Sequence, residues 1–294
     1  MKQKTLICIA AVLLFLVSGC AAPQEPAQIA ATTLPVYEFT TRLCDGTGIT
    51  VTRLVTENVS CLHDYSLNVS QVRSAEAAEL IVINGAGLED FMEDLLQDKS
   101  VIDSSAGVNL IECEDGHEHT HDHGHDHHHE ADSHIWLSPA NAMIMVQNIH
   151  ADLSSRYPQF RSVFDANLEV LLSDLTALEN YGTQQLHDLR CRELITFHDG
   201  FGYLAQAFDL EILDAVEEES GSEASASELK HLINEVRHHQ LPAIFTEEQG
   251  SVSAASVIVR ETGIQSYALN MAMSGDSWFD AMYRNIDTLK EALG

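Results

Sequence analysis

The feature that most constrains the fold is an alternation of short apolar runs, which favour β-strands, with helical stretches. In the first half the expected strands are 29–34, 49–55, 80–83 and a run that starts at 101. In the second half they are 193–197, 211–216, 243–246 and 264–269. Because helical stretches separate the strands, the pattern predicts two α/β units, each a parallel sheet with helices on both faces.

A long helical stretch lies between the two halves, from Pro158 to about Leu189, and its apolar residues keep helical spacing for several turns. Such a helix would be about 45 Å long. We interpret it as a strut between two domains; the alternative is an ordinary surface helix. The expected organisation is therefore an N-terminal α/β domain at 29–157, a linking helix at 158–189 and a C-terminal α/β domain at 190–294.

The N-terminus has the pattern of an export signal. A positively charged start is followed by an apolar run from Leu6 to Val17, which is too short to span a bilayer comfortably. The run ends in Val-Ser-Gly-Cys, which resembles the bacterial lipobox. We expect a signal peptide at 1–19, a lipid on Cys20 and a flexible tether at 20–28, so that the protein is extracytoplasmic and membrane-anchored. The alternative is an ordinary signal peptide with an incidental Cys.

The chain is strongly acidic, with 45 Asp and Glu against 15 Lys and Arg and a formal net charge of −30. This argues against nucleic acid or anionic lipid as a partner, because both attract a positive surface. The charge suits an exported protein that meets cations. It would equally suit a protein whose acidity only maintains solubility, so charge alone does not decide the function.

Four cysteines remain after the signal peptide and the lipidated Cys. They could form two disulfides by any of three pairings, or stay as buried free thiols. None forms a CxxC pair, so a zinc site built on cysteine is not expected. These residues are Cys44, Cys61, Cys113 and Cys191.

The most unusual stretch is 116–130, in which eight His alternate with acidic residues. Without apolar residues to bury it should be disordered, and it suits capture or buffering of metal ions; a purely solvating role is the alternative. An apolar stretch that begins with His134 follows. Ser138 suits a helix N-cap and Pro139 the first helical position.

Three His lie at or near expected strand ends, where open α/β sheets bind ligands. His63 is in the loop after strand 49–55, His198 directly follows strand 193–197, and His134 precedes the helix at Pro139. Each alone could be structural. Together, three neutral imidazoles with an open position suit zinc, whereas manganese would favour a carboxylate in place of one His. The candidates for a fourth ligand are water, Asp276, Glu247 and the run Glu217–Glu219.

Four motifs resemble a known family, the zinc-binding lipoproteins that serve ABC importers (solute-binding proteins of the metal-specific cluster A-I). The motifs are His63–Ser66 with Ser70–Val72, Asn84–Glu89, the His-rich stretch that leads to His134–Pro139, and Thr196–Tyr203. The resemblance implies two (βα)₄ domains joined by one long rigid helix, with a metal in the interdomain cleft. It also implies that His63, His134 and His198 are the metal ligands.

The chain departs from the family pattern in three places: before His63, after Tyr65, and at 270–273, which lacks a carboxylate that some members use as fourth ligand. The resemblance nevertheless implies a function: capture of Zn²⁺ outside the membrane and delivery to an ABC permease, by a monomer that is not an enzyme. The alternatives are a protein for manganese or another divalent metal, a zinc buffer or adhesin, and a zinc hydrolase. The hydrolase is disfavoured because no obvious general base is tied to the three His.

Overall fold

The computed structural model describes residues 28–59, 62, 65–112, 131–217, 224–248 and 253–294. The strands of the first half are β1 (Ile29–Ala31), β2 (Val51–Arg53), β3 (Leu80–Ile83) and β4 (Val101–Asp103). Those of the second half are β5 (Glu193–His198), β6 (Glu211–Glu217), β7 (Ala243–Glu247) and β8 (Gln265–Leu269). They form two four-stranded parallel sheets with the orders β2-β1-β3-β4 and β6-β5-β7-β8.

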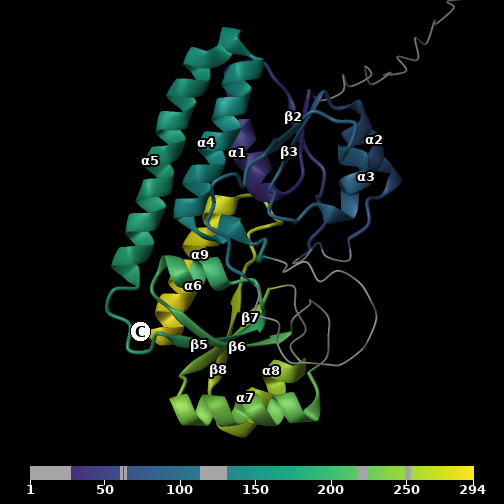
Figure 1. The fold of residues 1–294 in the computed structure, drawn as a ribbon. Helices are drawn as coiled ribbons and strands as arrows, with labels where there is room; N and C mark the ends of the chain where they lie inside the picture. Colours follow the sequence, from purple (N-terminus) through teal and green to yellow (C-terminus); the bar gives the residue numbers. More distant parts are fainter. Residues whose placement is uncertain (1–27, 60–61, 63–64, 113–130, 218–223, 249–252) are drawn as a thin grey trace, which may run out of the picture.

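Helices cover both faces of each sheet (Figure 1). The first half contains α1 (Leu34–Cys44), α2 (Val69–Ala77), α3 (Glu93–Leu96) and α4 (Pro139–Arg156). The second half contains α6 (Gly202–Ala207), α7 (Ala226–His239), α8 (Ser253–Thr262) and α9 (Trp278–Leu293). Short 3₁₀ turns lie at η1 (Asp90–Met92), η2 (Ile135–Leu137) and η3 (Pro158–Phe160). The predicted fold of two parallel α/β units is confirmed.

The central strands β1, β3, β5 and β7 are almost fully buried, because helices cover both of their faces. Successive side chains of a strand point to opposite faces. In β3, Val82 therefore joins the largest hydrophobic core, while Ile81 joins a smaller core beneath α2 and α3. In β7, Phe245 joins the largest core, and Ile244 joins a smaller core beneath α7 and α8.

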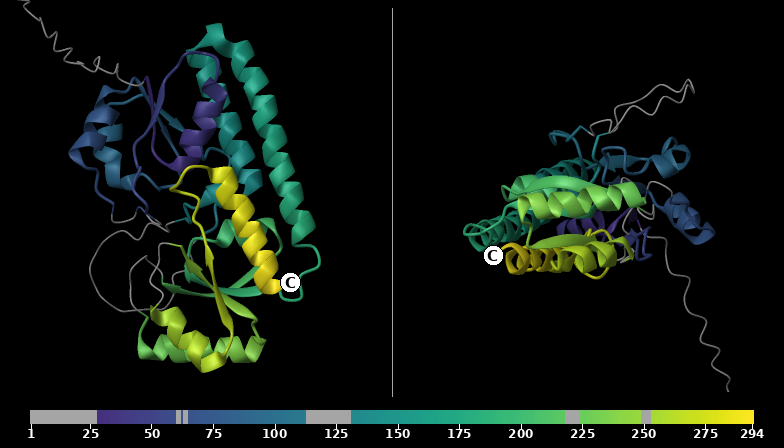
Figure 2. Two further views of the ribbon diagram at one scale, coloured as in Figure 1. Left: turned by 180° about the vertical axis from the view of Figure 1, so that it is seen from behind. Right: turned by 90° about the horizontal axis from the view of Figure 1, so that it is seen from below.

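The long helix α5 (Arg161–Gln185) has 25 residues, a length of about 38 Å. It packs against α1 and α4 in the first half and against α9 in the second (Figures 1 and 2). A Cβ at Gly182 would lie 2.2 Å from Cε1 of Phe208, so the Phe208 ring packs directly on the helix backbone. The long linking helix is confirmed, preceded by η3 at Pro158. The exact domain limits stay a prediction.

The largest core runs through both halves of the molecule. Its clearest junction is between α1 and α9, where the rings of Phe39 and Trp278 pack edge to face with centroids 5.0 Å apart. Glu38 accepts a hydrogen bond from the backbone N–H of Trp278 at 2.6 Å. Helix α9 therefore packs against α1 (Figure 2). The two halves share one continuous hydrophobic core.

The amphipathic stretch 88–96 forms two short helical segments, η1 followed by α3, and not one continuous helix. Just before η1, the side chain of Glu89 is turned inward and is 4% exposed. Its carboxylate accepts hydrogen bonds from the Thr32 hydroxyl (2.5 Å) and from the backbone N–H groups of Asn84 (2.8 Å) and Gly85 (3.0 Å). Burial raises the pKa of Glu89 to about 7, although these hydrogen bonds act in the opposite direction.

Cys44 and Cys191 are free thiols, so the two-disulfide alternative is wrong. Cys61 and Cys113 lie outside the described residues. Burial raises the pKa of the Cys44 thiol to about 12, which keeps it protonated and unreactive.

The expected signal peptide, Cys20, the tether and the His-rich stretch at 116–130 also lie outside the described residues. Among the helices of the described ranges, none has the length and apolar character needed to cross a bilayer.

Candidate metal site

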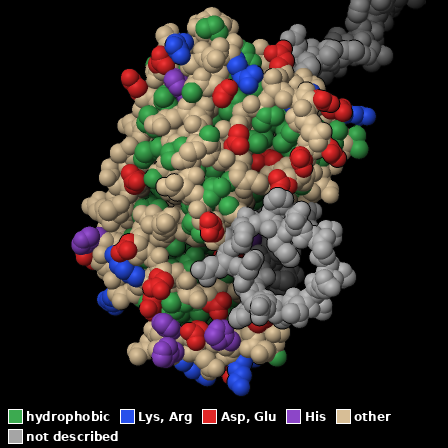
Figure 3. Space-filling view, viewed as in Figure 1, with side chains coloured by type: hydrophobic (Ala, Val, Ile, Leu, Met, Phe, Trp, Pro, Cys, Tyr) green, Lys and Arg blue, Asp and Glu red, His purple; other side chains and the backbone are tan. Residues whose placement is uncertain are grey.

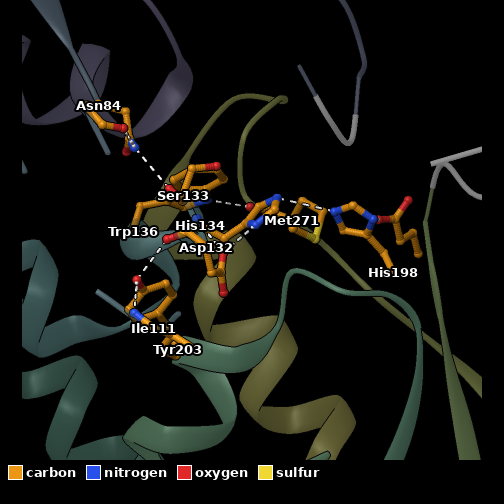
Figure 4. Close-up of polar contacts among 11 residues, drawn as sticks. Asn84, Ile111, Asp132, Ser133, His134, Trp136, His198, Tyr203 and Met271 are labelled. Atoms are coloured by element: carbon orange, nitrogen blue, oxygen red, sulfur yellow. Dashed lines mark hydrogen bonds and ion pairs between the residues drawn. The ribbon is translucent and has the colours of Figure 1, made fainter. Parts of the chain in front are cut away.

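Two of the three predicted ligands meet between the two halves of the molecule (Figure 4). The Nε2 atoms of His134 and His198 lie 3.2 Å apart, and the two residues are 3% and 2% exposed. Two nitrogens bound to one tetrahedral zinc ion at 2.0–2.1 Å are separated by about 3.3 Å. The pair therefore has the spacing of two ligands on one zinc ion.

The register of the second sheet places His198. This residue ends β5, and β5 pairs with β7 in parallel at Thr196 and Phe245. Two residues further on, the pairing brings His198 beside Glu247, which ends β7. The Oε1 atom of Glu247 lies 3.7 Å from Nδ1 of His198, and both side chains are almost fully buried. A carboxylate therefore faces one ring nitrogen while the other points toward His134.

His134 is held by an acid two residues before it. Oδ1 of Asp132 accepts hydrogen bonds from the backbone N–H of His134 at 2.8 Å and from its Nδ1 at 2.7 Å. Because a carboxylate oxygen is an acceptor, Nδ1 carries the proton and the Nε2 lone pair points to the site. Carboxylate–imidazole pairs of this kind are the usual outer support of a metal-bound His.

The segment that carries His134 is fixed to both halves (Figure 4). The Asn84 side chain, after β3, donates to the Ser133 carbonyl at 3.1 Å. The buried Trp136 indole donates to the carbonyl of Met271, after β8, at 2.7 Å. Downstream, Ser138 Oγ accepts the N–H of Asn141 at 3.3 Å, which confirms the predicted helix start.

The third predicted ligand, His63, lies outside the described residues. Its neighbour Leu62 is buried in the largest core, and upstream the Asn58 side chain accepts a hydrogen bond from Ser274 Oγ at 2.8 Å. The structure thus brings His134 and His198 together and leaves His63 a prediction. In the described part of the chain, no three His, Cys, Asp or Glu residues are grouped so that they could hold a metal ion.

Among the candidates for a fourth ligand, Asp276 is exposed. Glu247 faces Nδ1 of His198, on the ring side away from His134. It is therefore placed to orient the imidazole. Residues 218–219 lie outside the described residues.

Sequence reasoning missed the roles of Asp132 and Trp136. Asp132 carries a weak signal, because an acid two residues before a His can accept both the backbone and the ring hydrogen bond. The contact of Trp136 with Met271 joins residues 135 positions apart, and no local pattern predicts it.

The surface agrees with the acidic composition. On the face in Figure 3, Asp and Glu side chains are spread over both halves, and Lys and Arg are sparse. A continuous positive surface that could receive a polyanion is absent from the described residues on this face.

Comparisons with known proteins agree with this geometry. The chain is 29% identical over 279 residues to the high-affinity zinc uptake system protein ZnuA of Bacillus subtilis, covering 90% of this chain and 87% of that protein. It is 28% identical over 310 residues to the zinc-binding lipoprotein AdcA of Streptococcus pneumoniae, covering 99% of this chain. The match spans 61% of the length of AdcA.

Solved structures of the same two kinds of protein, ZnuA and AdcA, are also similar to this chain. A crystal structure of ZnuA superposes with a TM-score of 0.79 at 27% identity, covering 91% of this chain and all of that one. The Zn(II)-bound ZnuA-like domain of Streptococcus pneumoniae AdcA superposes with a TM-score of 0.74 at 26% identity, covering 90% of this chain and 98% of that domain. Residues 29–292 match the family model of ZnuA, the periplasmic component A of a zinc-uptake complex, and the chain therefore belongs to this family.

Proposed function

We propose that this protein captures Zn²⁺ outside the cytoplasmic membrane and delivers it to an ABC importer. The observation that carries the proposal is the buried pair of Nε2 atoms, 3.2 Å apart, in His134 and His198. Similarity to proteins named for zinc binding and zinc uptake supports it. The ion is cargo, so the site needs strong nitrogen ligands and a route for release.

His63 is the proposed third ligand. The hydrogen bond from Ser274 to Asn58 supports this, because it ties the loop that carries His63 to the connection after β8, next to Met271. A set of three imidazoles favours zinc over manganese, which prefers oxygen ligands and binds nitrogen sites more weakly. Water completes the shell in this proposal.

The proposed setting is extracytoplasmic, with a lipid on Cys20 as the membrane anchor and an ABC permease as the partner. The protein would act there as a monomer and as a binding protein without catalytic activity. The AdcA relative is named a lipoprotein, which supports the anchor.

The test is a zinc titration of the lipid-free protein against a competing chelator, with and without residues 116–130. We expect one tight site that survives the deletion and is lost in His198→Ala. His187→Ala is the matched control, because the His187 side chain is 76% exposed. Tight binding that disappears with 116–130 would instead identify a buffer and reject the cleft assignment.

The same titration with Mn²⁺ should give weaker binding; tighter binding of Mn²⁺ would favour the manganese alternative. Delivery is tested separately in the source cell by deletion of the gene. Loss of growth at limiting zinc, restored by the wild-type gene but not by the His198→Ala gene, would distinguish import from passive buffering.

A further inference from the structure

Tyr203 joins the two segments that carry the histidine pair. It lies in α6, on the connection that begins at His198, and is 1% exposed. Its hydroxyl accepts a hydrogen bond from the backbone N–H of Ile111 at 2.9 Å and donates one to the carbonyl of Asp132 at 2.8 Å (Figure 4). The hydroxyl thus acts as donor and acceptor at once.

The two residues whose backbone groups the Tyr203 hydroxyl binds, Ile111 and Asp132, are far apart in the sequence but lie side by side in the structure. The N–H of Asp132 donates to the carbonyl of Ile111 at 2.9 Å, and Glu112 and Ala131 form an antiparallel bridge. These contacts bring together the two ends of the segment between Ile111 and Asp132. Tyr203 closes this junction from the other half of the molecule.

The first residue of α6 shows how closely the helix approaches the junction. A Cβ at Gly202 would lie 3.2 Å from Oδ2 of Asp132 and 3.3 Å from Cδ1 of Ile111. Both distances are tighter than ordinary packing, so glycine lets α6 reach the Asp132 backbone. The other carboxylate oxygen, Oδ1, holds the His134 ring.

A chain of contacts therefore runs from α6 through Asp132 to His134. We propose that Tyr203 is a positioning residue for zinc binding: its hydroxyl fixes Asp132, so that the Asp132 carboxylate holds Nε2 of His134 toward His198. The inference rests on the proposed zinc-binding function. It assigns Tyr203 no contact with the ion.

The test is Tyr203→Phe, which removes the hydroxyl and keeps the buried ring. We expect zinc affinity, measured on the full lipid-free protein against a chelator, to fall roughly 10-fold, the lower end for loss of an outer support. Tyr181→Phe is the matched control, because it removes an exposed hydroxyl that donates to Asp287 at 2.6 Å. That control should keep wild-type affinity.

A second measurement separates positioning from general loss of structure. In the metal-free wild-type protein, NMR should show His134 as the tautomer protonated at Nδ1, with the proton in a strong hydrogen bond. In Tyr203→Phe this signal should broaden or shift, while the signals of core residues beneath α7 stay in place.

Wild-type affinity in Tyr203→Phe together with an unchanged His134 signal would overturn the proposal. Global loss of dispersed signals would also overturn it, because Tyr203 would then be structural only. If the wild-type protein itself fails to bind zinc, the proposed function is wrong, and the His134 signal still decides the role of Tyr203.

Discussion

Oδ1 of Asp132 lies 2.7 Å from Nδ1 of His134, and the same oxygen accepts the His134 backbone N–H. Asp132→Asn removes the negative charge that fixes this ring. Zinc affinity should fall about 10- to 100-fold, as is usual for loss of an outer-shell partner. The matched control is Asp188→Asn, since the Asp188 side chain pairs with His187 but is 94% exposed. Chelator competition that gives equal affinities for all three proteins would contradict this role.

Glu247 should act as a support and not as a ligand, because its carboxylate faces Nδ1 of His198. Glu247→Gln should weaken zinc binding roughly 10-fold. X-ray absorption at the zinc edge should show the same number of nitrogen and oxygen neighbours in the variant as in the wild type. A coordination shell reduced by one oxygen would show that Glu247 binds the ion.

Zinc should stabilise the whole molecule, because the site joins two halves that share one core. At a free zinc concentration 100 times the Kd, the gain in unfolding free energy is about 2.7 kcal/mol. Calorimetry should show one transition that moves to higher temperature with zinc in the wild type and stays in place in His198→Ala. Two transitions, of which only one responds to zinc, would show that the halves unfold separately.

Glu89 should make stability depend on pH. Its pKa in the folded state is raised by burial to about 7, from an ordinary value of 4.5. The folded protein therefore binds this proton more tightly than the unfolded chain. The stabilising contribution is complete below about pH 4.5 and is lost as the pH rises through about 7, by up to roughly 3 kcal/mol.

Glu89→Gln removes this titration, so the slope of unfolding free energy against pH between 4.5 and 7 should flatten. The variant should also be less stable overall, because an amide NH₂ cannot accept all three hydrogen bonds. Urea unfolding across this pH range measures both effects. A slope equal to that of the wild type would show that Glu89 keeps one charge state throughout.

Gly182→Ala should destabilise the junction of α5 with the second half. Alanine favours a helix, but its Cβ would lie 2.2 Å from the Phe208 ring, and such overpacking costs about 1–3 kcal/mol. Thr183→Ala, at the exposed neighbouring position, is the control and should have little effect. Chemical denaturation in which Gly182→Ala is as stable as the control would show that the Phe208 ring moves freely.

The sequence predicted the elements well where local periodicity decides them, as in the strands around Ile81 and Ile244 and in the long helix α5. It did not show that 88–96 would divide into η1 and α3, where the buried Glu89 binds Thr32, just after β1, and the turn after β3. A local helical pattern carries no information about such distant partners. In the site, strand ends and composition pointed to His134 and His198. The approach of Glu247 to His198 depends on β5 lying next to β7, and that order is a property of the folded sheet.

The packing of Trp278 on Phe39 has a consequence for biosynthesis. The part of α1 around Phe39 is covered only when the last helix has been made, so a nascent chain that ends before Trp278 carries an incomplete first half. Pairing such distant segments makes folding slow, and the unfinished intermediate exposes apolar surface that can aggregate. The packing of the first half is therefore complete only after α9 has been synthesised.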